Sequence, residues 1–278
     1  MAWLSTTTST HGQCSQPLPF ELERYIFILA SANSPLNNIC SYLLVARRVH
    51  CWTEKLLYQS VTLSDEERAC QFISSLALRP DFAQAKVTTL CMTGSVHIAT
   101  ATQILWLCKG VTDLVLWIPP SYEAAASSAL SESLNTLPLV RISFPLSLIC
   151  GGLRVEFPSL PSIDLFTKIT HLELLEGWVL WNSTLGVEFL PCLTHLSLCL
   201  SVGRTDAALL HAVLGHPNMQ AMILRIQDHE RAQGWLDGAG ISDRRVVLVD
   251  QLEQEIILAG AQTTLWQYAD HIVQQRSQ

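Results

Sequence analysis

Six short stretches of the chain follow the pattern apolar–any–any–apolar–any–apolar. They are "VTTLCM" (87–92), "VTDLVL" (111–116), "LVRISF" (139–144), "ITHLEL" (169–174), "LTHLSL" (193–198) and "MQAMIL" (219–224). Alternation with a period of two is typical of a strand with one buried face. The central apolar residues recur every 24 to 30 residues, which predicts a stacked repeat array with one parallel strand per unit. A seventh, weaker copy is "RVVLVD" (245–250).

Several of the intervening segments have the pattern of short helices. Three of them stand at 99–110, 121–135 and 205–218, with Ser121 and Thr205 as expected N-caps and Gly110 and Gly215 as stop signals. The proline-containing stretch 145–168 has a Gly-Gly pair and predicts loops or an extra hairpin. Near the end, "TTLWQYADHIVQQRS" (263–277) predicts a helix that covers the last repeat.

The first 63 residues follow a different, helical period. In "PLPFELERYIFILAS" (17–31), Leu22, Ile26 and Leu29 share one helical face. A second amphipathic segment (40–63) spaces Val45, Val49, Trp52 and Leu56 in the same way. Such faces usually pack within their own chain, and helices this short must pack on each other, on the repeats or on another protein. We expect a disordered tail (1–16), a helical module (17–63), a linking helix (64–82) and the α/β repeat array (83–278).

Composition and charge narrow the classes of function. The formal charge is −7, from 17 basic and 24 acidic residues, and the basic residues form no cluster, which argues against nucleic-acid binding. Apolar residues make up 49% of the chain, yet no run approaches the ~18 residues of a membrane span. The first residues lack the features of a secretory signal, and the nine cysteines contain no C-x-x-C pair. We therefore expect reduced thiols and a cytoplasmic or nuclear protein.

The sequence contains no recognisable catalytic motif, so we assign no catalytic residue, metal or cofactor and expect a protein that is not an enzyme. Cys91 and Cys199 lie on predicted strands without a nearby base. His171 and His195 would be neighbours on adjacent strands, but no third metal ligand is evident. An enzyme without a known motif would instead require perturbed carboxylates or histidines gathered in a pocket.

The N-terminal helices carry a resemblance to a known family. "LPFELERYIF" (18–27) and "LLVARRVHCWTEKLLYQSVTL" (43–63) together resemble the F-box-like segment of a large group of fungal proteins that also carry a divergent leucine-rich-repeat array. The matching positions are Leu18, Pro19, Glu21, Leu22, Ile26, Leu44, Val45, Arg48, Val49, Trp52, Leu57 and Tyr58. The stretch "SANSPLNNIC" (31–40) departs from the family because it lacks the acidic-leucine start usually found there.

The resemblance implies a substrate-recruiting subunit of a Skp-cullin ubiquitin ligase. Its helical module would bind a Skp-type adaptor protein, and through it a cullin, with Leu18, Pro19, Leu22, Ile26, Val45, Val49 and Trp52. The repeats would present a surface to an unknown protein target. The alternative is a stand-alone protein-binding scaffold in which the F-box-like helices only cap the solenoid and their apolar face is covered by the chain's own residues.

Strand alternation predicts the target-binding face. If Leu172 and Leu174 point inward, the residues between them point to the opposite side of the sheet. The predicted target-binding residues are Asp113, Trp117, Arg141, His171, Glu173, His195, Ser197 and Arg225. We expect this mixed row of aromatic, charged and polar side chains to be exposed.

Overall fold

The computed structural model describes residues 18–32, 36–121, 123–149, 159–176, 181–250 and 262–277. The chain divides into two compact units, residues 1–57 and 58–278. The sequence analysis placed the end of the helical module at residue 63. The structure assigns 58–63 to the second unit, because Ser60–Leu63 forms a strand that pairs with the next one.

The N-terminal unit is helical, with α1 (Phe20–Ala32), α2 (Leu36–Tyr42) and α3 (Arg47–Gln59). Pro19 directly precedes α1, where its fixed φ suits a helix start, and its carbonyl accepts hydrogen bonds from the backbone of Leu22 and Glu23. Both predicted amphipathic segments contain a helix, α1 in the first and α3 in the second, although the second ends in strand β1.

The second unit is a mixed α/β structure built on one parallel sheet of eight strands in sequential order. The strands are β1 (Ser60–Leu63), β2 (Thr89–Thr93), β3 (Asp113–Trp117), β4 (Arg141–Phe144), β5 (His171–Leu174), β6 (His195–Cys199), β7 (Ala221–Ile226) and β8 (Val246–Asp250). Each of the six predicted hexads overlaps one strand, β2 to β7, and the weaker seventh copy overlaps β8. The sequence analysis missed β1, which is only four residues long and lies beside a helical segment.

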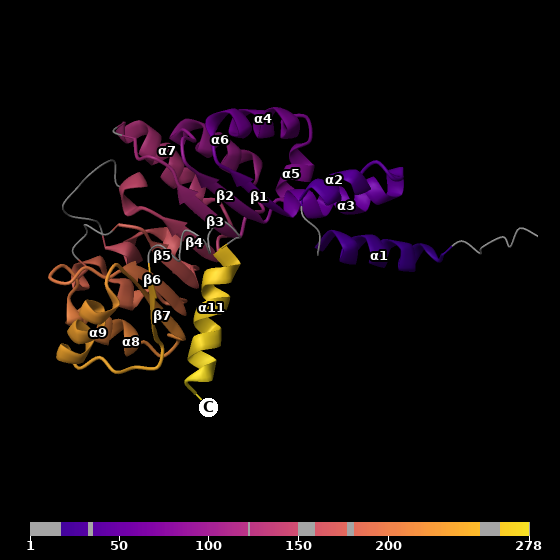
Figure 1. Cartoon of the computed structure of the whole chain (residues 1–278). Helices are drawn as coiled ribbons and strands as arrows, with labels where there is room; N and C mark the ends of the chain where they lie inside the picture. Colours follow the sequence, from indigo (N-terminus) through magenta and orange to yellow (C-terminus); the bar gives the residue numbers. More distant parts are fainter. Residues whose placement is uncertain are drawn as a thin grey trace, which may run out of the picture. The chain divides into compact units, whose positions relative to one another are not determined.

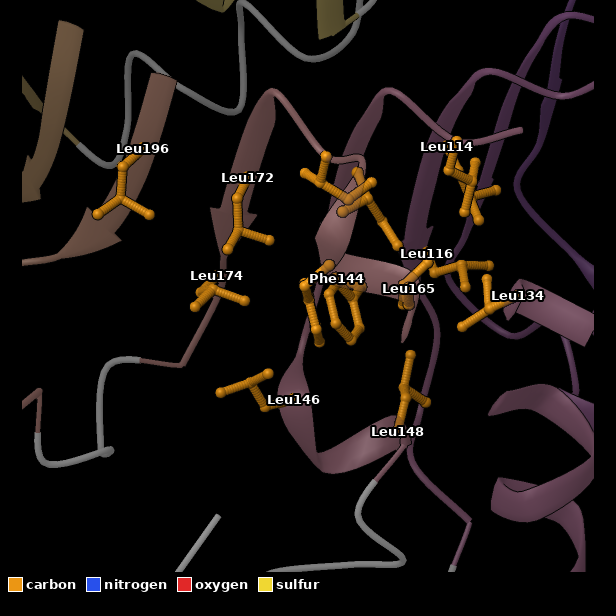
Figure 2. Packing of buried hydrophobic residues seen from close by; sticks show 14 of the residues in the cluster. Leu114, Leu116, Leu134, Phe144, Leu146, Leu148, Leu165, Leu172, Leu174 and Leu196 are labelled. Carbon is orange, nitrogen blue, oxygen red and sulfur yellow. The ribbon is translucent and has the colours of Figure 1, made fainter. Parts of the chain in front are cut away.

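The central residues of the hexads pair with one another across the whole sheet. Leu90, Leu114, Ile142, Leu172, Leu196 and Met222 follow in register from β2 to β7. All six side chains are fully buried. Together with residues two positions further along, such as Phe144 and Leu174, they form the main core (Figure 2). Because each strand is short, its apolar residues are covered only when neighbouring strands stack beside them.

Short helices and 3-10 turns supply the other side of this core. The α-helices are α4 (Glu66–Leu76), α5 (Pro80–Lys86), α6 (Ile98–Leu107), α7 (Ala124–Asn135), α8 (Ala207–Leu214) and α9 (His229–Gly238). The 3-10 turns are η1 (Leu146–Leu148), η2 (Leu160–Ser162), η3 (Asp164–Thr167), η4 (Ser183–Leu185) and η5 (Val187–Phe189). Buried leucines from α6, α7 and α8, among them Leu105, Leu134 and Leu210, belong to the main core.

Several predicted helix ends differ by a few residues. The predicted linking helix is two helices, α4 and α5, because Pro80 begins a new helix and Arg79 before it is not helical. Asp206 caps α8 in place of Thr205, and Glu123 precedes α7, with its backbone N–H donating to the Ser121 hydroxyl. Helix α6 ends at Leu107, before Gly110, whereas Gly215 does end α8. The described part of 145–168 forms 3-10 turns, and 150–158 lies outside the described residues.

The segment 263–277 forms the predicted C-terminal helix, α11 (Gln262–Gln275), which lies against the strands of the last two units. It packs on the sheet face opposite the main core, against β7 and β8, where Leu265, Trp266 and Ala269 join Ala221, Ile223, Val247 and Val249 in a second apolar cluster. In Figure 1, α11 (yellow) runs along the stack of strands. Among the described residues, no helix is both long enough and apolar enough to cross a membrane.

Candidate protein-binding surfaces

One side of α1 faces its own unit. Successive helix residues turn by about 100°, so Phe20, Glu23 and Phe27 lie within one narrow face. The Phe20 ring meets Trp52 of α3 edge-on at 5.0 Å between ring centroids, and the Glu23 carboxylate forms an ion pair with Arg48 at 2.8 Å. Phe27 contacts Tyr42 at 5.9 Å between ring centroids. These contacts hold one side of α1 against its own unit, although Phe20 itself remains 52% exposed.

The side turned away is also apolar. We define the α1 outer face as Leu22, Tyr25, Ile26 and Leu29, which lie about 180° around the helix from Phe20. Leu22 and Ile26 are each 51% exposed, and Tyr25 and Leu29 are exposed as well. The described part of the N-terminal unit therefore does not bury Leu22, Ile26 and Leu29, and packing of this face on the rest of the chain stays a prediction. An exposed apolar patch of this kind is typical of a protein-interaction site.

The predicted adaptor-binding residues separate into two groups. Leu18, Pro19, Leu22, Ile26 and Val45 are exposed, and Leu44 beside Val45 is 87% exposed. By contrast, Val49 is fully buried and Trp52 is half-buried against Phe20. Val49 and Trp52 therefore support the helices from within, and the first group forms the accessible apolar surface.

A hollow adjoins this surface. It has a volume of about 340 Å³ and is lined by Leu18, Glu23, Ile26, Phe27 and Arg48. Its wall thus combines apolar side chains with the Glu23–Arg48 ion pair. Sequence reasoning did not anticipate it, because it forms where α1 meets α3.

The predicted target-binding row occupies the sheet face opposite the main core, as alternation requires, but it is not an exposed surface. Asp113, Glu173, His195, Ser197 and Arg225 are buried, and Trp117, Arg141 and His171 are half-buried. The expectation that the whole row is exposed is therefore wrong. Alternation specifies which side of the sheet a residue faces and carries no information on what covers that side.

Polar side chains on this face bond from strand to strand. The Trp117 ring N–H donates to the Ser143 hydroxyl at 2.8 Å, and that hydroxyl donates to the Glu173 carboxylate at 2.6 Å. The Ser197 hydroxyl donates to the same carboxylate at 3.5 Å, and Arg225 lies 3.9 Å from it. The chain of contacts runs from β3 to β7, so five strands share one polar network.

Two further charged contacts extend the network. Arg141 forms an ion pair with Asp113 of the neighbouring strand. The Arg225 guanidinium donates to the backbone carbonyl of Leu174. Buried charges are tolerated when they are paired and hydrogen-bonded, so these contacts offset part of the cost of burying the polar row.

The two histidines stack face to face. The His171 and His195 rings lie 4.1 Å apart and 3° from parallel, and the Trp266 ring of α11 meets both edge-on. His195 Nε2 lies 2.9 Å from an Asp270 carboxylate oxygen. Burial, together with the nearby His195 and Arg141, lowers the pKa of His171 to about 3. His171 is therefore neutral at pH 7.

The described residues give no support to metal binding or thiol chemistry. Among them, no group of three or more His, Cys, Asp or Glu side chains is arranged to hold a metal ion. Burial raises the pKa of the Cys91 thiol to about 11 and that of Cys108 to about 12. Both thiols are protonated at neutral pH and are poor nucleophiles.

A second hollow lies where β2 and β3 lead into their helices. It has a volume of about 490 Å³ and is lined by Ser95, Val96, His97, Ile98, Pro119, Pro120, Ser121 and Glu123. The start of α6 beside it is already capped, because the Glu66 carboxylate accepts from the His97 backbone N–H at 2.8 Å and from the Thr100 hydroxyl. An anion would have to compete with this carboxylate.

No protein-family model matches the chain, and no curated protein matches it.

Proposed function

We propose that this protein is a substrate-recruiting F-box-type subunit of a Skp-cullin ubiquitin ligase. The N-terminal unit would bind a Skp-type adaptor, and the second unit, as a divergent leucine-rich-repeat solenoid, would hold a protein target. The chain's contribution would be proximity, because it places the target where a recruited enzyme can reach it.

The α1 outer face is the observation that carries this proposal. Leu22, Tyr25, Ile26 and Leu29 remain exposed while the opposite side of α1 is held by Phe20, Glu23 and Phe27. The F-box-like resemblance assigns adaptor binding to Leu22 and Ile26. The scaffold alternative requires this face to be covered by the chain's own residues, and within the described part of the N-terminal unit it is exposed.

The solenoid part of the proposal draws on the order of the strands. Eight parallel strands follow one another in sequence order, and the six hexads return every 24 to 30 residues. That arrangement is the one a stacked repeat array produces, since each unit contacts only its neighbours.

The test is capture of a purified Skp-type adaptor by the intact chain and by the double variant Leu22→Asp/Ile26→Asp. Burying the exposed half of these two side chains contributes about 2 kcal/mol, so their loss should weaken binding by at least about 30-fold. The matched control is Leu78→Asp/Phe189→Asp, which replaces two exposed apolar residues of the second unit, 92% and 69% exposed. The control should bind like the parent.

Two results would contradict the proposal. The intact, folded chain could capture no adaptor, or the α1 variant and the control could bind equally well. Circular dichroism of each variant shows whether the helices are intact.

A further inference from the structure

Helix α11 crosses four strands of the sheet. Trp266 contacts His171 of β5 and His195 of β6, Asp270 contacts His195, and the Arg276 guanidinium just after the helix donates to the Val246 carbonyl of β8 at 2.6 Å. The ten residues from 266 to 276 span about 15 Å of helix, and the three steps from β5 to β8 span about 14 Å of sheet. The helix therefore lies across β5–β8, over the His171 and His195 part of the polar row.

The sheet surface on which α11 packs is separate from the main core. Its apolar part is the second cluster, in which Leu265, Trp266 and Ala269 pack on β7 and β8. The main core lies on the opposite face and is built from other residues. Departure of α11 would therefore open one face of the sheet without removing a residue from the main core.

Two polar side chains of α11 are only weakly stabilised where the helix packs on the sheet. Among the described residues, no group accepts a hydrogen bond from the buried Trp266 ring N–H, and a buried unsatisfied donor is unfavourable. The Asp270 carboxylate, which contacts His195, is 47% exposed, so water screens this contact. A partner helix that accepts a hydrogen bond from the Trp266 position, or that adds a charged contact, would therefore compete well with α11 for this surface.

The sheet surface beneath α11 has the chemistry of a helix-binding groove. An amphipathic helix is recognised by apolar side chains placed three and four positions apart, and α11 presents Leu265, Trp266 and Ala269 in that spacing, followed by an acid at Asp270. The receiving side is held rigid by the bonded row from Ser143 through Glu173 to Ser197, and a rigid receiving side reduces the cost of ordering on binding.

We propose that the face of β5–β8 is the target-binding site, that α11 occupies it in the resting chain, and that the target supplies an amphipathic helix of the same chemistry. That helix would place a bulky aromatic residue against the His171–His195 pair, a small residue over β7 and β8, and a carboxylate at His195. The assignment of this helix to a recruited target rests on the proposed function. Helix α11 would then be an autoinhibitory contact that the target displaces.

The test uses the full chain and a fluorescent synthetic peptide of residues 262–277. In the variant Trp266→Ala/Asp270→Ala the chain's own helix is weakened while the strands are unchanged. A tethered competitor acts at a high effective concentration, so this variant should bind the peptide at least about tenfold more tightly than the parent. The matched control, Tyr268→Ala/His271→Ala, alters two exposed residues on the outward side of α11 and should bind the peptide like the parent.

Hydrogen exchange on the unmodified parent provides an independent measurement. The backbone amides of α11 should exchange at least about tenfold faster than those of β6 and β7, through an opening of α11 alone. Equal protection of α11 and the strands would overturn the proposal, and so would equal peptide affinity of parent and weakened variant. Adaptor capture depends on α1, so a failure there is distinguishable from a failure here.

Discussion

Replacement of Glu173 tests whether the polar row stabilises the sheet. The Glu173 side chain is fully buried, it accepts hydrogen bonds from Ser143 and Ser197, and it lies beside Arg225, which is only 4% exposed. Glu173→Ala leaves the buried guanidinium without this carboxylate and two hydroxyls without their acceptor. Breaking a buried ion pair from one side costs about 3–5 kcal/mol. Since a domain is stabilised by only about 5–15 kcal/mol, we expect a large loss.

Urea unfolding followed by circular dichroism measures the effect. Glu173→Gln should cost less than Glu173→Ala, because the amide oxygen can still accept from Ser143. The double variant Glu173→Ala/Arg225→Met should be more stable than the sum of the single changes predicts, because the second change removes the buried charge that the first leaves behind. The reasoning fails if Glu173→Ala lies within about 1 kcal/mol of the parent, or if the two changes are additive.

Three further predictions concern single residues. The pKa of His171 lies below its unfolded value, near 6.5, so its contribution is present above pH 6.5 and is lost as the pH falls toward 3. By pH 5 we expect up to about 2 kcal/mol of lost stability, lessened by the part of the ring that water reaches. His171→Asn should reduce the dependence of the unfolding free energy on pH, measured by urea unfolding. An unchanged pH dependence contradicts the assignment. Gly94→Ala should lower the unfolding midpoint, because φ is +65° and the new Cβ would meet the Ser64 carbonyl at 2.4 Å. Gly234→Ala within α9 adds a Cβ with no atom within 4 Å and should be neutral or stabilising by up to about 1 kcal/mol. A Gly94→Ala variant more stable than the Gly234→Ala variant would refute this. Cys91, with a pKa near 11, should react with a thiol reagent much more slowly than the exposed cysteines, as mass spectrometry of the labelled chain can check, and equal rates would contradict it.

The two candidate surfaces suit different partners. The α1 outer face is open, apolar and uncharged, so a partner can bury it without first displacing a helix. The β5–β8 face is mixed in character and already holds α11, so a partner there must compete. If both proposals hold, adaptor binding would be constitutive, and target binding would depend on the opening of α11.

The periodicity of the sequence determined the sheet. The side-chain alternation of a strand is a local property, and six hexads with in-register central residues need only that property and a regular spacing to be recognised. The helical spacing of apolar residues, which is also a local property, located α1, α3 and α11. It missed β1, because Ser60–Leu63 carries no hexad, and it joined α4 to α5, because Pro80 was not treated as a helix start.

Only the tertiary structure decided what covers each face. Helix α1 has apolar residues on two opposite sides. Phe20 and Phe27 contact Trp52 and Tyr42, whereas Leu22 and Ile26 lie on the other side and are 51% exposed, although Phe20 itself is still 52% exposed. Similarly, alternation assigned Glu173 and His195 to the second face of the sheet. Their burial is a property of the folded structure, and for His195 it includes contacts with Trp266 and Asp270 of α11, which follows β8 in the sequence. Such contacts join residues distant in sequence, and a local pattern contains no information about them.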